Sequence, residues 1–269
     1  MSHETLFVER AGAILTVTLN RPKQLNAINR VMAQELDDLA RSLEADRAVH
    51  VVIITGAGDR AFLAGADITE FQEPTPVQAL EFSQRIQRLY SRIEALPQVT
   101  IAAVNGFALG GGCELTQCCD LVLASETARF GQPEINLGVI PGAGGTQRLA
   151  RLVGLHRAKE LNYLGEAIDA AEAHRIGLVN RVVAPDRLLP EARALAEKLA
   201  VKAPVALRMI KEAMNDGFDL DLPKGLALEA KAWACAWACA ALPWWITSMV
   251  RGGTGLPWAT ISASPTTFP

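Results

Sequence analysis

Residues 99–115 read Val99-Thr-Ile-Ala-Ala-Val-Asn-Gly-Phe-Ala-Leu-Gly-Gly-Gly-Cys-Glu-Leu115, and this stretch indicates the fold. Its first six residues form an apolar run of strand length, which predicts a strand buried on both faces. Three glycines follow, directly before a predicted helix. Their backbone N–H groups are unshielded, and the helix dipole adds partial positive charge at the same point, so the turn is suited to holding an oxyanion. A tight turn with close backbone packing also explains the glycines.

A regular alternation of strands and helices extends from this stretch in both directions. Val51–Thr55 predicts a second buried strand, and the loop Ala64-Gly-Ala-Asp-Ile68 follows it, so both loops lie at carboxyl ends of strands, where α/β proteins bind ligands. Further strands are predicted at 13–19 and 120–124, with Val8 on a pairing strand, and helices at 31–43 behind an Asn29 N-cap, 80–96, 145–153 and beyond 187. The pattern predicts an α/β protein with a mainly helical C-terminal part.

Two carboxylates accompany the glycine-rich loops. Glu114 directly follows the three glycines, and Glu134 lies in Phe130-Gly-Gln-Pro-Glu-Ile135. A glutamate in a first helical turn is often only a complement to the helix dipole. Two such groups beside glycine-rich loops also fit an alternative function, in which they share a water molecule and divide acid and base roles between them.

Composition and motifs argue against several classes of protein. The chain has 269 residues and a net charge of -3, without the basic excess of a nucleic-acid-binding protein. Neither a targeting peptide nor a membrane-spanning helix is indicated, which leads us to expect a cytoplasmic protein. The five cysteines and four histidines show no metal-ligand spacing, and the cysteines near Glu114 are expected to pack as small apolar residues.

Two glycine-rich segments resemble nucleotide-binding motifs without meeting their requirements. Gly56-Ala-Gly-Asp-Arg-Ala61 follows a strand, but Gly65 interrupts the long helix that a dinucleotide-binding unit needs at this point. Gly142-Ala-Gly-Gly-Thr146 lacks the lysine of a phosphate-binding P-loop. We therefore expect no nucleotide cofactor.

Several segments together resemble the enoyl-CoA hydratase, or crotonase, family, in the family's order and spacing. These segments are Leu19-Asn-Arg-Pro22 with Leu25-Asn-Ala27, Ala64–Ile68, Gly106–Glu114, Phe130–Glu134 and Gly138–Arg148. The resemblance covers roughly residues 4–231. It implies a spiral of ββα units with a helical C-terminal region, an acyl-CoA thioester as substrate with no separate cofactor or metal, and assembly as a homo-hexamer built from two trimers.

The resemblance also implies roles for individual residues. The N–H groups of Ala66 and Gly111 match the oxyanion hole that polarises the thioester carbonyl. Glu114 matches the residue that activates the attacking water, and Glu134 matches the residue that exchanges a proton with the α-carbon. Positions near coenzyme A are matched by Ala64, Asp67, Ile68 and Lys23, although Lys23 also fits an ordinary solvated lysine.

Both carboxylates together favour reversible syn hydration of a 2-trans-enoyl-CoA to a 3-hydroxyacyl-CoA, as in fatty acid β-oxidation, since one group is needed for the water and one for the carbon-bound proton. Three alternatives stay open: an enoyl-CoA isomerase, a hydratase-lyase acting on an aromatic enoyl-CoA, and an acyl-CoA-binding subunit with impaired activity.

The end of the chain departs from the family. We expect a spiral core over 1–195, a helical region over 196–231 and an atypical tail over 232–269. Of the 55 charged residues only Arg251 lies in the tail, which also contains all five tryptophans. Two interpretations stay open, a change of reading frame near residue 232 and a genuine hydrophobic extension that packs against a neighbouring subunit.

Overall fold

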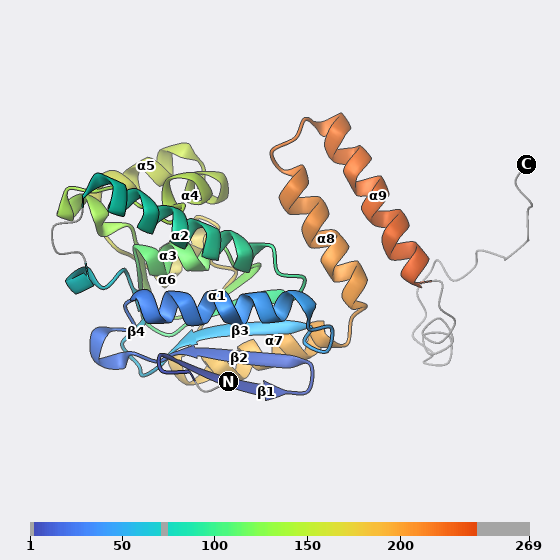
Figure 1. Cartoon of the computed structure of the whole chain (residues 1–269), viewed down its shortest axis with the longest axis horizontal. Helices are drawn as coiled ribbons and strands as arrows, with labels where there is room; N and C mark the ends of the chain where they lie inside the picture. The colour runs from blue at the N-terminus through green and yellow to red at the C-terminus, as the bar shows by residue number, and fades with distance from the viewer. Residues whose placement is uncertain (1–2, 71–74, 241–269) are drawn as a thin grey trace, which may run out of the picture. The chain divides into compact units, whose positions relative to one another are not determined.

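The computed structural model describes residues 3–70 and 75–240. The chain divides into two compact units between Arg208 and Met209 (Figure 1). The domain ranges expected from the sequence stay a prediction.

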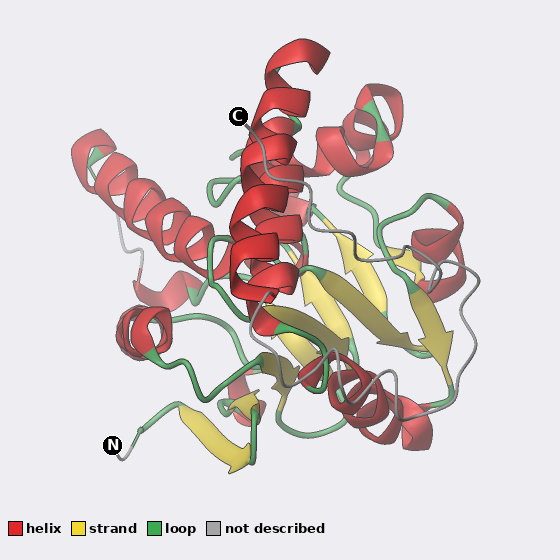
Figure 2. Ribbon diagram, turned by 90° about the vertical axis from the view of Figure 1, so that its right-hand side faces the viewer, coloured by secondary structure: helices red, strands yellow, loops and turns green. Residues whose placement is uncertain are grey.

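Within the described residues the strands of the first unit form two sheets (Figure 2). The larger has six strands in the order β1 (Leu6–Ala11), β2 (Ile14–Leu19), β3 (Val51–Gly56), β5 (Val99–Val104), β7 (Leu121–Ser125) and β10 (Arg181–Val183). The smaller has four, in the order β4 (Ala61–Ala64), β6 (Phe107–Leu109), β8 (Arg129–Gly131) and β9 (Ile168–Asp169). All pairings are parallel except β1 with β2 and β8 with β9.

The two sheets are built together, turn by turn. The chain forms three successive ββα repeats. In each repeat the first strand belongs to the larger sheet and the second to the smaller: β3 then β4, β5 then β6, and β7 then β8. Helical segments follow the second strand each time, namely α2 (Pro76–Glu94), α3 (Gly111–Thr116), and η3 (Pro133–Leu137) with α4 (Gly145–Val153). This repetition is the expected spiral of ββα units. It places the loops after β4, β6 and β8 next to one another, because these strands are neighbours.

The remaining helices complete the first unit. They are α1 (Arg30–Ala45), α5 (Leu155–Leu164), α6 (Ala170–Arg175) and α7 (Leu188–Ala200), with short 3-10 helices at η1 (Pro22–Gln24), η2 (Ile68–Glu70) and η4 (Pro185–Arg187). The predicted N-cap of α1 is confirmed, because the Asn29 side chain accepts a hydrogen bond from the Met32 N–H at 2.9 Å. Strand β4, and not a helix, follows Gly56, as the argument against a dinucleotide fold requires.

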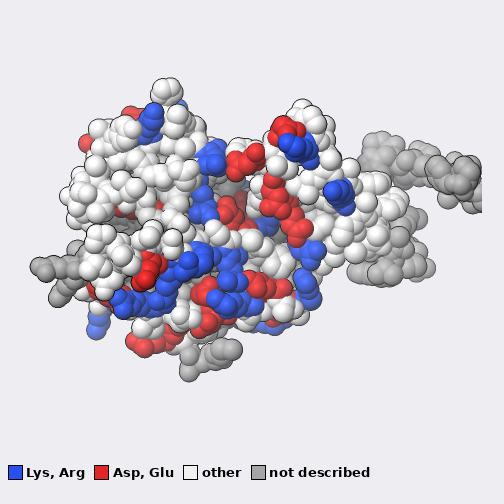
Figure 3. All heavy atoms as spheres, turned by 45° about the horizontal axis from the view of Figure 1, so that its top comes forward, with Lys and Arg blue, Asp and Glu red and all other residues white. Residues whose placement is uncertain are grey.

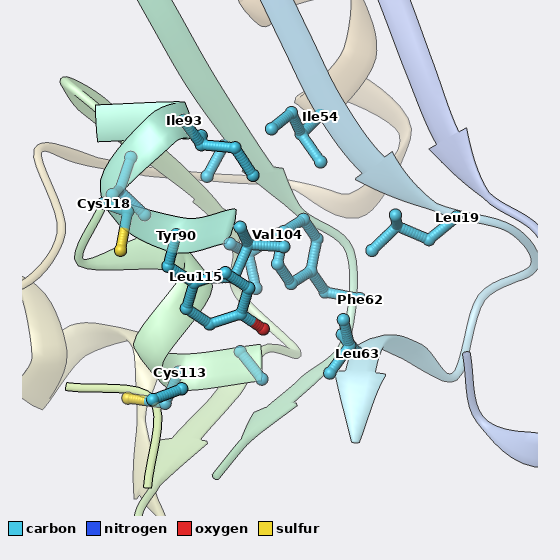
Figure 4. Packing of buried hydrophobic residues seen from close by; sticks show 14 of the residues in the cluster. Leu19, Ile54, Phe62, Leu63, Tyr90, Ile93, Val104, Cys113, Leu115 and Cys118 are labelled. Carbon is cyan, nitrogen blue, oxygen red and sulfur yellow. The ribbon is translucent and has the colours of Figure 1, made fainter. Parts of the chain in front are cut away.

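The central strands β3 and β5 of the larger sheet are buried on both faces, as their continuous apolar runs predict. Val51, Ile53 and Ile101 face a core formed with α7, whereas Val52 and Ile54 belong to a second core that also includes residues of α1, α2 and α3. Alternation along one strand thus supplies both cores. Figure 4 shows the second core, in which Tyr90 of α2 lies beside Leu115 of α3.

The second unit consists, in its described part, of α8 (Pro204–Gly217) from Met209 onward and α9 (Leu222–Ala240). Helix α9 continues through Lys231, where the charged composition ends, as far as Ala240. Its Trp233 and Trp237 side chains are stacked with ring centroids 5.3 Å apart. The rest of the atypical tail, residues 241–269, lies outside the described residues.

The surface carries both signs of charge. Figure 3 shows lysine and arginine interspersed with aspartate and glutamate on one face of the molecule. Among the described helices, none combines the length and the apolar character needed to cross a membrane.

Candidate active site

The loops after β4 and β6 bring Ala66 and Gly111 together. The two strands pair in parallel with Ala64 opposite Leu109, so two further residues along each chain place Ala66 near Gly111. The close approach is direct, since a Cβ built on Gly111 would lie 3.9 Å from the carbonyl carbon of Gly65.

Within the described residues, the N–H groups of Ala66 and Gly111 have no hydrogen-bond acceptor. Ala66 forms a parallel bridge with Ile28, in which the hydrogen bonds are made by the N–H of Asp67 and the carbonyl of Gly65. The N–H of Ala66 therefore points to the other side of the loop. Gly111 is the first residue of α3, where helical N–H groups have no acceptor within the helix.

Close packing and ligand access, the two explanations of the glycines, apply to different positions. At Gly112 a Cβ would lie 1.8 Å from the Leu63 carbonyl oxygen, so this glycine allows α3 to pack against β4. Gly110 has a φ of 51°, and a Cβ there would lie 2.6 Å from Oε1 of Glu134. The Glu134 carboxyl group thus lies directly over the start of α3.

Glu114 projects from the first turn of α3 into the protein and is only 2% exposed. Its Oε1 accepts hydrogen bonds from the N–H groups of Ala143 at 2.7 Å and Gly145 at 2.8 Å. Burial raises the pKa of Glu114, and these two N–H groups and the positive charge of Arg148 partly offset that effect. The carboxyl group is therefore fixed in orientation.

Glu134 approaches from η3 and is half-buried. Its Oε2 is buried without a hydrogen-bond partner in the described part of the chain. Burial, followed by the nearby charge of Glu114, raises the pKa of Glu134 to about 7. A carboxyl group with such a pKa exchanges protons readily at neutral pH.

The segments expected near coenzyme A also come together. Asp67 forms an ion pair with Arg21 at 2.8 Å, and the N–H of Ala64 donates to the carbonyl of Leu25 at 3.1 Å. These contacts join the loop that carries Lys23, which is exposed in η1, to the loop 64–68. Ala64 is half-buried at the end of β4, and Ile68 begins η2.

Comparison with known proteins gives the same family over most of the chain. The family model described as enoyl-CoA hydratase/isomerase matches residues 9–237. The chain belongs to this family. The match confirms the resemblance found in the sequence. It ends within α9, six residues past Lys231.

Individual members of the enoyl-CoA hydratase/isomerase family are similar over nearly their full length. A crotonyl-CoA hydratase of Syntrophomonas wolfei is 45% identical, with 88% of this chain and 92% of the relative covered. A short-chain-enoyl-CoA hydratase of Clostridium acetobutylicum is 47% identical, with 86% and 89% covered. The crystal structure of an enoyl-CoA hydratase from Bacillus anthracis superimposes with a TM-score of 0.84 at 41% identity, covering 86% of this chain and 90% of that one.

Three further residues contact or border the site of this hydratase/isomerase family member, and the sequence analysis did not single them out. The Tyr90 hydroxyl donates to the Gly111 carbonyl oxygen at 2.8 Å and steadies the start of α3 (Figure 4). Gln132 is fully buried, with both side-chain polar atoms unpartnered among the described residues. Arg148 contacts the loop that binds Glu114. Tyr90 and Arg148 lie on amphipathic helices, where ordinary packing is the default interpretation.

The cysteines nearest Glu114 pack as small apolar residues, as expected. Cys113 and Cys118 are buried, and burial raises the pKa of Cys113 to about 12, so it stays a thiol. Just before β7, Asp120 accepts hydrogen bonds from the N–H and hydroxyl of Thr100 in β5 at 2.7 and 2.9 Å.

Proposed function

We propose that this protein is an enoyl-CoA hydratase that adds water reversibly and syn across the double bond of a 2-trans-enoyl-CoA. Glu114 takes a proton from the attacking water, whose oxygen bonds to the β-carbon. The double-bond electrons move onto the thioester, and the N–H groups of Ala66 and Gly111 stabilise the resulting enolate oxygen. Glu134 then delivers a proton to the α-carbon. The product is a 3-hydroxyacyl-CoA, and dehydration runs through the same steps in reverse.

The observation that carries this proposal is the meeting of two desolvated carboxyl groups near two backbone N–H groups, those of Ala66 and Gly111, that have no acceptor among the described residues. Glu134 lies over Gly110, the N-cap of α3, and Glu114 projects from the first turn of the same helix, which begins at Gly111. The charge of one raises the pKa of the other, which favours a state in which the pair shares one proton. Hydration needs that state, with one group as base and the other as acid.

The unpartnered polar atoms support the same assignment. Oε2 of Glu134 and both polar atoms of the Gln132 amide are buried without partners in the described region. Buried polar atoms are normally hydrogen-bonded, so such atoms in a native structure call for a ligand or water. A reacting water and the polar end of an acyl thioester supply these hydrogen bonds.

The two named relatives support hydration as the reaction and an acyl-CoA thioester as the substrate. Lys23, Ala64, Asp67 and Ile68 are proposed to border coenzyme A. Two carboxyl groups and two N–H groups suffice for this chemistry, so we propose no metal and no resident cofactor. A homo-hexamer in the cytoplasm is proposed as the working form.

The assignment is tested by Glu114→Gln and Glu134→Gln, each assayed for hydration of crotonyl-CoA. Each variant is expected to lose activity by about a hundredfold or more, the usual contribution of a positioned acid or base. Asp120→Asn is the matched control, since it changes a nearby carboxyl group that accepts hydrogen bonds from Thr100. Near-normal turnover in either glutamine variant would remove that residue from the mechanism, and a double-bond shift as the main product would favour the isomerase.

A further inference from the structure

Arg148 of α4 makes a fork of contacts beside the site. Its Nε and Nη2 donate to Oε2 of Glu94 at 3.0 and 2.7 Å, and Nη2 also donates to the Ser91 hydroxyl at 3.0 Å. Its Nη1 donates in the other direction, to the carbonyl oxygen of Ala143 at 3.1 Å. One guanidinium therefore joins α2 to the loop before α4.

That loop is the one whose N–H groups hold Glu114. Ala143 presents its carbonyl to Arg148 and its N–H to Glu114, so the same residue is fixed on both sides. Gly144 has a φ of 119°, and a Cβ there would lie 2.2 Å from Nη1 of Arg148. Only glycine lets the guanidinium cross the loop at this point.

We propose that Arg148, held by Glu94, is a positioning residue for Glu114: it fixes the loop 142–145 so that the N–H groups of Ala143 and Gly145 bind the catalytic carboxyl group. The inference rests on the proposed function, since it assumes that Glu114 is the base. Neither Glu94 nor Arg148 touches the reacting atoms in this assignment.

The geometry favours a specific role over an ordinary surface ion pair. The Arg148 side chain is only 16% exposed, and its contacts are directional, with three different acceptors. A lysine offers a single point charge and is unable to reproduce the fork. The positive charge also favours the ionised form of Glu114, against the effect of burial.

The groups that act electrostatically on Glu114, or on which it acts, come from each element packed around it. They are Tyr90 of α2, Cys113 and Cys118 on α3 or at its end, Glu134 of η3 and Arg148 of α4. Tyr90 and the two thiols are buried with raised pKa values and stay neutral near pH 7. Arg148 is therefore the cation in this set, and its removal is expected to raise the pKa of Glu114.

The test compares Arg148→Gln, Arg148→Lys and Glu94→Gln in the full chain with crotonyl-CoA. Arg148→Gln is expected to lower kcat by about ten- to a hundredfold, with little change in KM, because it loosens a group used in the chemical step. In the pH profile of kcat/KM, the acid limb of Arg148→Gln is expected to move to higher pH, because the pKa of Glu114 rises. Arg148→Lys keeps the charge and hence the acid limb, but loses part of kcat, and Glu94→Gln gives an intermediate loss. Arg151→Gln, an exposed arginine on the same helix, is the control and stays at wild-type activity.

Equal losses in Arg148→Gln and Arg148→Lys, with the acid limb unmoved, would show a merely structural ion pair and overturn the inference. Should Arg148→Gln fail to fold, a wild-type kcat in Arg148→Lys overturns it equally. Failure of the proposed function has a different signature, namely an active Glu114→Gln. An inactive Glu114→Gln together with an unaltered Arg148→Gln overturns the positioning role alone.

Discussion

The two site glutamates differ because their surroundings differ. Glu114 is the more deeply buried, yet two N–H groups bind its carboxyl oxygen and favour the ionised form. Glu134 has an unpartnered oxygen and a neighbouring negative charge, and its pKa rises to about 7. Different environments thus fit the two side chains to the proposed roles of base and acid, although the side chains are chemically identical.

This separation predicts the pH dependence of the reaction. Hydration needs one proton on the pair, so kcat/KM for crotonyl-CoA is expected to fall as pH rises through about 7, where Glu134 loses that proton. Dehydration of 3-hydroxybutyryl-CoA needs the same total protonation with the roles exchanged. Its profile is therefore expected to be parallel, as the pH-independent equilibrium also demands. Measuring both directions on one preparation checks this, and a flat profile between pH 6 and 9 would contradict it.

Burial of Glu134 also predicts that its ionised side chain destabilises the folded protein at pH values above 7. Its folded-state pKa of about 7 lies above the ordinary value of 4.5. The stabilisation from burying the neutral carboxyl group is therefore fully present below pH 4.5 and is lost as pH rises through about 7. Glu134→Gln removes the cost of a buried charge. Allowing for partial exposure of the side chain, we expect it to raise the free energy of unfolding by roughly 1–2 kcal/mol at pH 8 and by little at pH 4.5. Urea unfolding at both pH values measures this, and equal effects at the two would contradict it.

The sequence marks Glu114 and Glu134 as candidate reacting residues, but it does not reveal the residues that contact them. Glu114 and Glu134 stand beside glycine-rich loops and are therefore conspicuous. Gln132 and Arg148 lie within the same motifs, yet nothing in their spacing reveals that one amide is left unpartnered or that one guanidinium crosses a loop. Such roles depend on contacts between segments far apart in the chain, such as Glu94 with Arg148.

At the scale of elements, the long buried strands and the amphipathic helices were predictable because their periodicity is strong. Strands β3 and β5 and helix α1 lie where the pattern placed them. The short strands of the smaller sheet were missed, since three or four residues such as Phe107–Leu109 carry no period. Their pairing nevertheless aligns Ala66 with Gly111.

The contact between α3 and β4 is expected to be the most sensitive to added volume. Gly112→Ala places a methyl group where the Leu63 carbonyl oxygen lies, so α3 must move away from β4 and from Ala66. We expect a loss of hydration of about a hundredfold or more, the typical effect of losing an oxyanion donor, together with lower stability. Gly12→Ala is the control: it lies in the turn between β1 and β2 with nothing within 4 Å and costs about 1 kcal/mol through its φ of 60°. Equal kcat values in the two variants would contradict the argument.

At the scale of the whole molecule, the uneven distribution of charged residues and tryptophans along the chain can be placed on the structure. The charged part of the chain ends at Lys231, within α9, and the tryptophans begin two residues later. The second unit exposes a set of large apolar side chains comprising Met214, Phe218, Leu222, Leu226, Trp233 and Trp237. Apolar groups in such number on a small helical unit are typical of a surface covered by another protein.

The proposed hexamer is expected to depend on this apolar surface. Wild-type protein should have a mass of about 173 kDa, six times the 28.9 kDa chain. Trp233→Gln with Trp237→Gln removes two large side chains, each 64% exposed in the isolated chain and each contributing roughly 2 kcal/mol when covered. The concentration at which the assembly dissociates is then expected to rise by at least about tenfold. Light scattering over a dilution series measures it, with Lys231→Gln on the same helix as the control. A mass that is the same in both variants and wild type at every concentration would place the subunit interface elsewhere and favour a tail that contributes nothing to assembly.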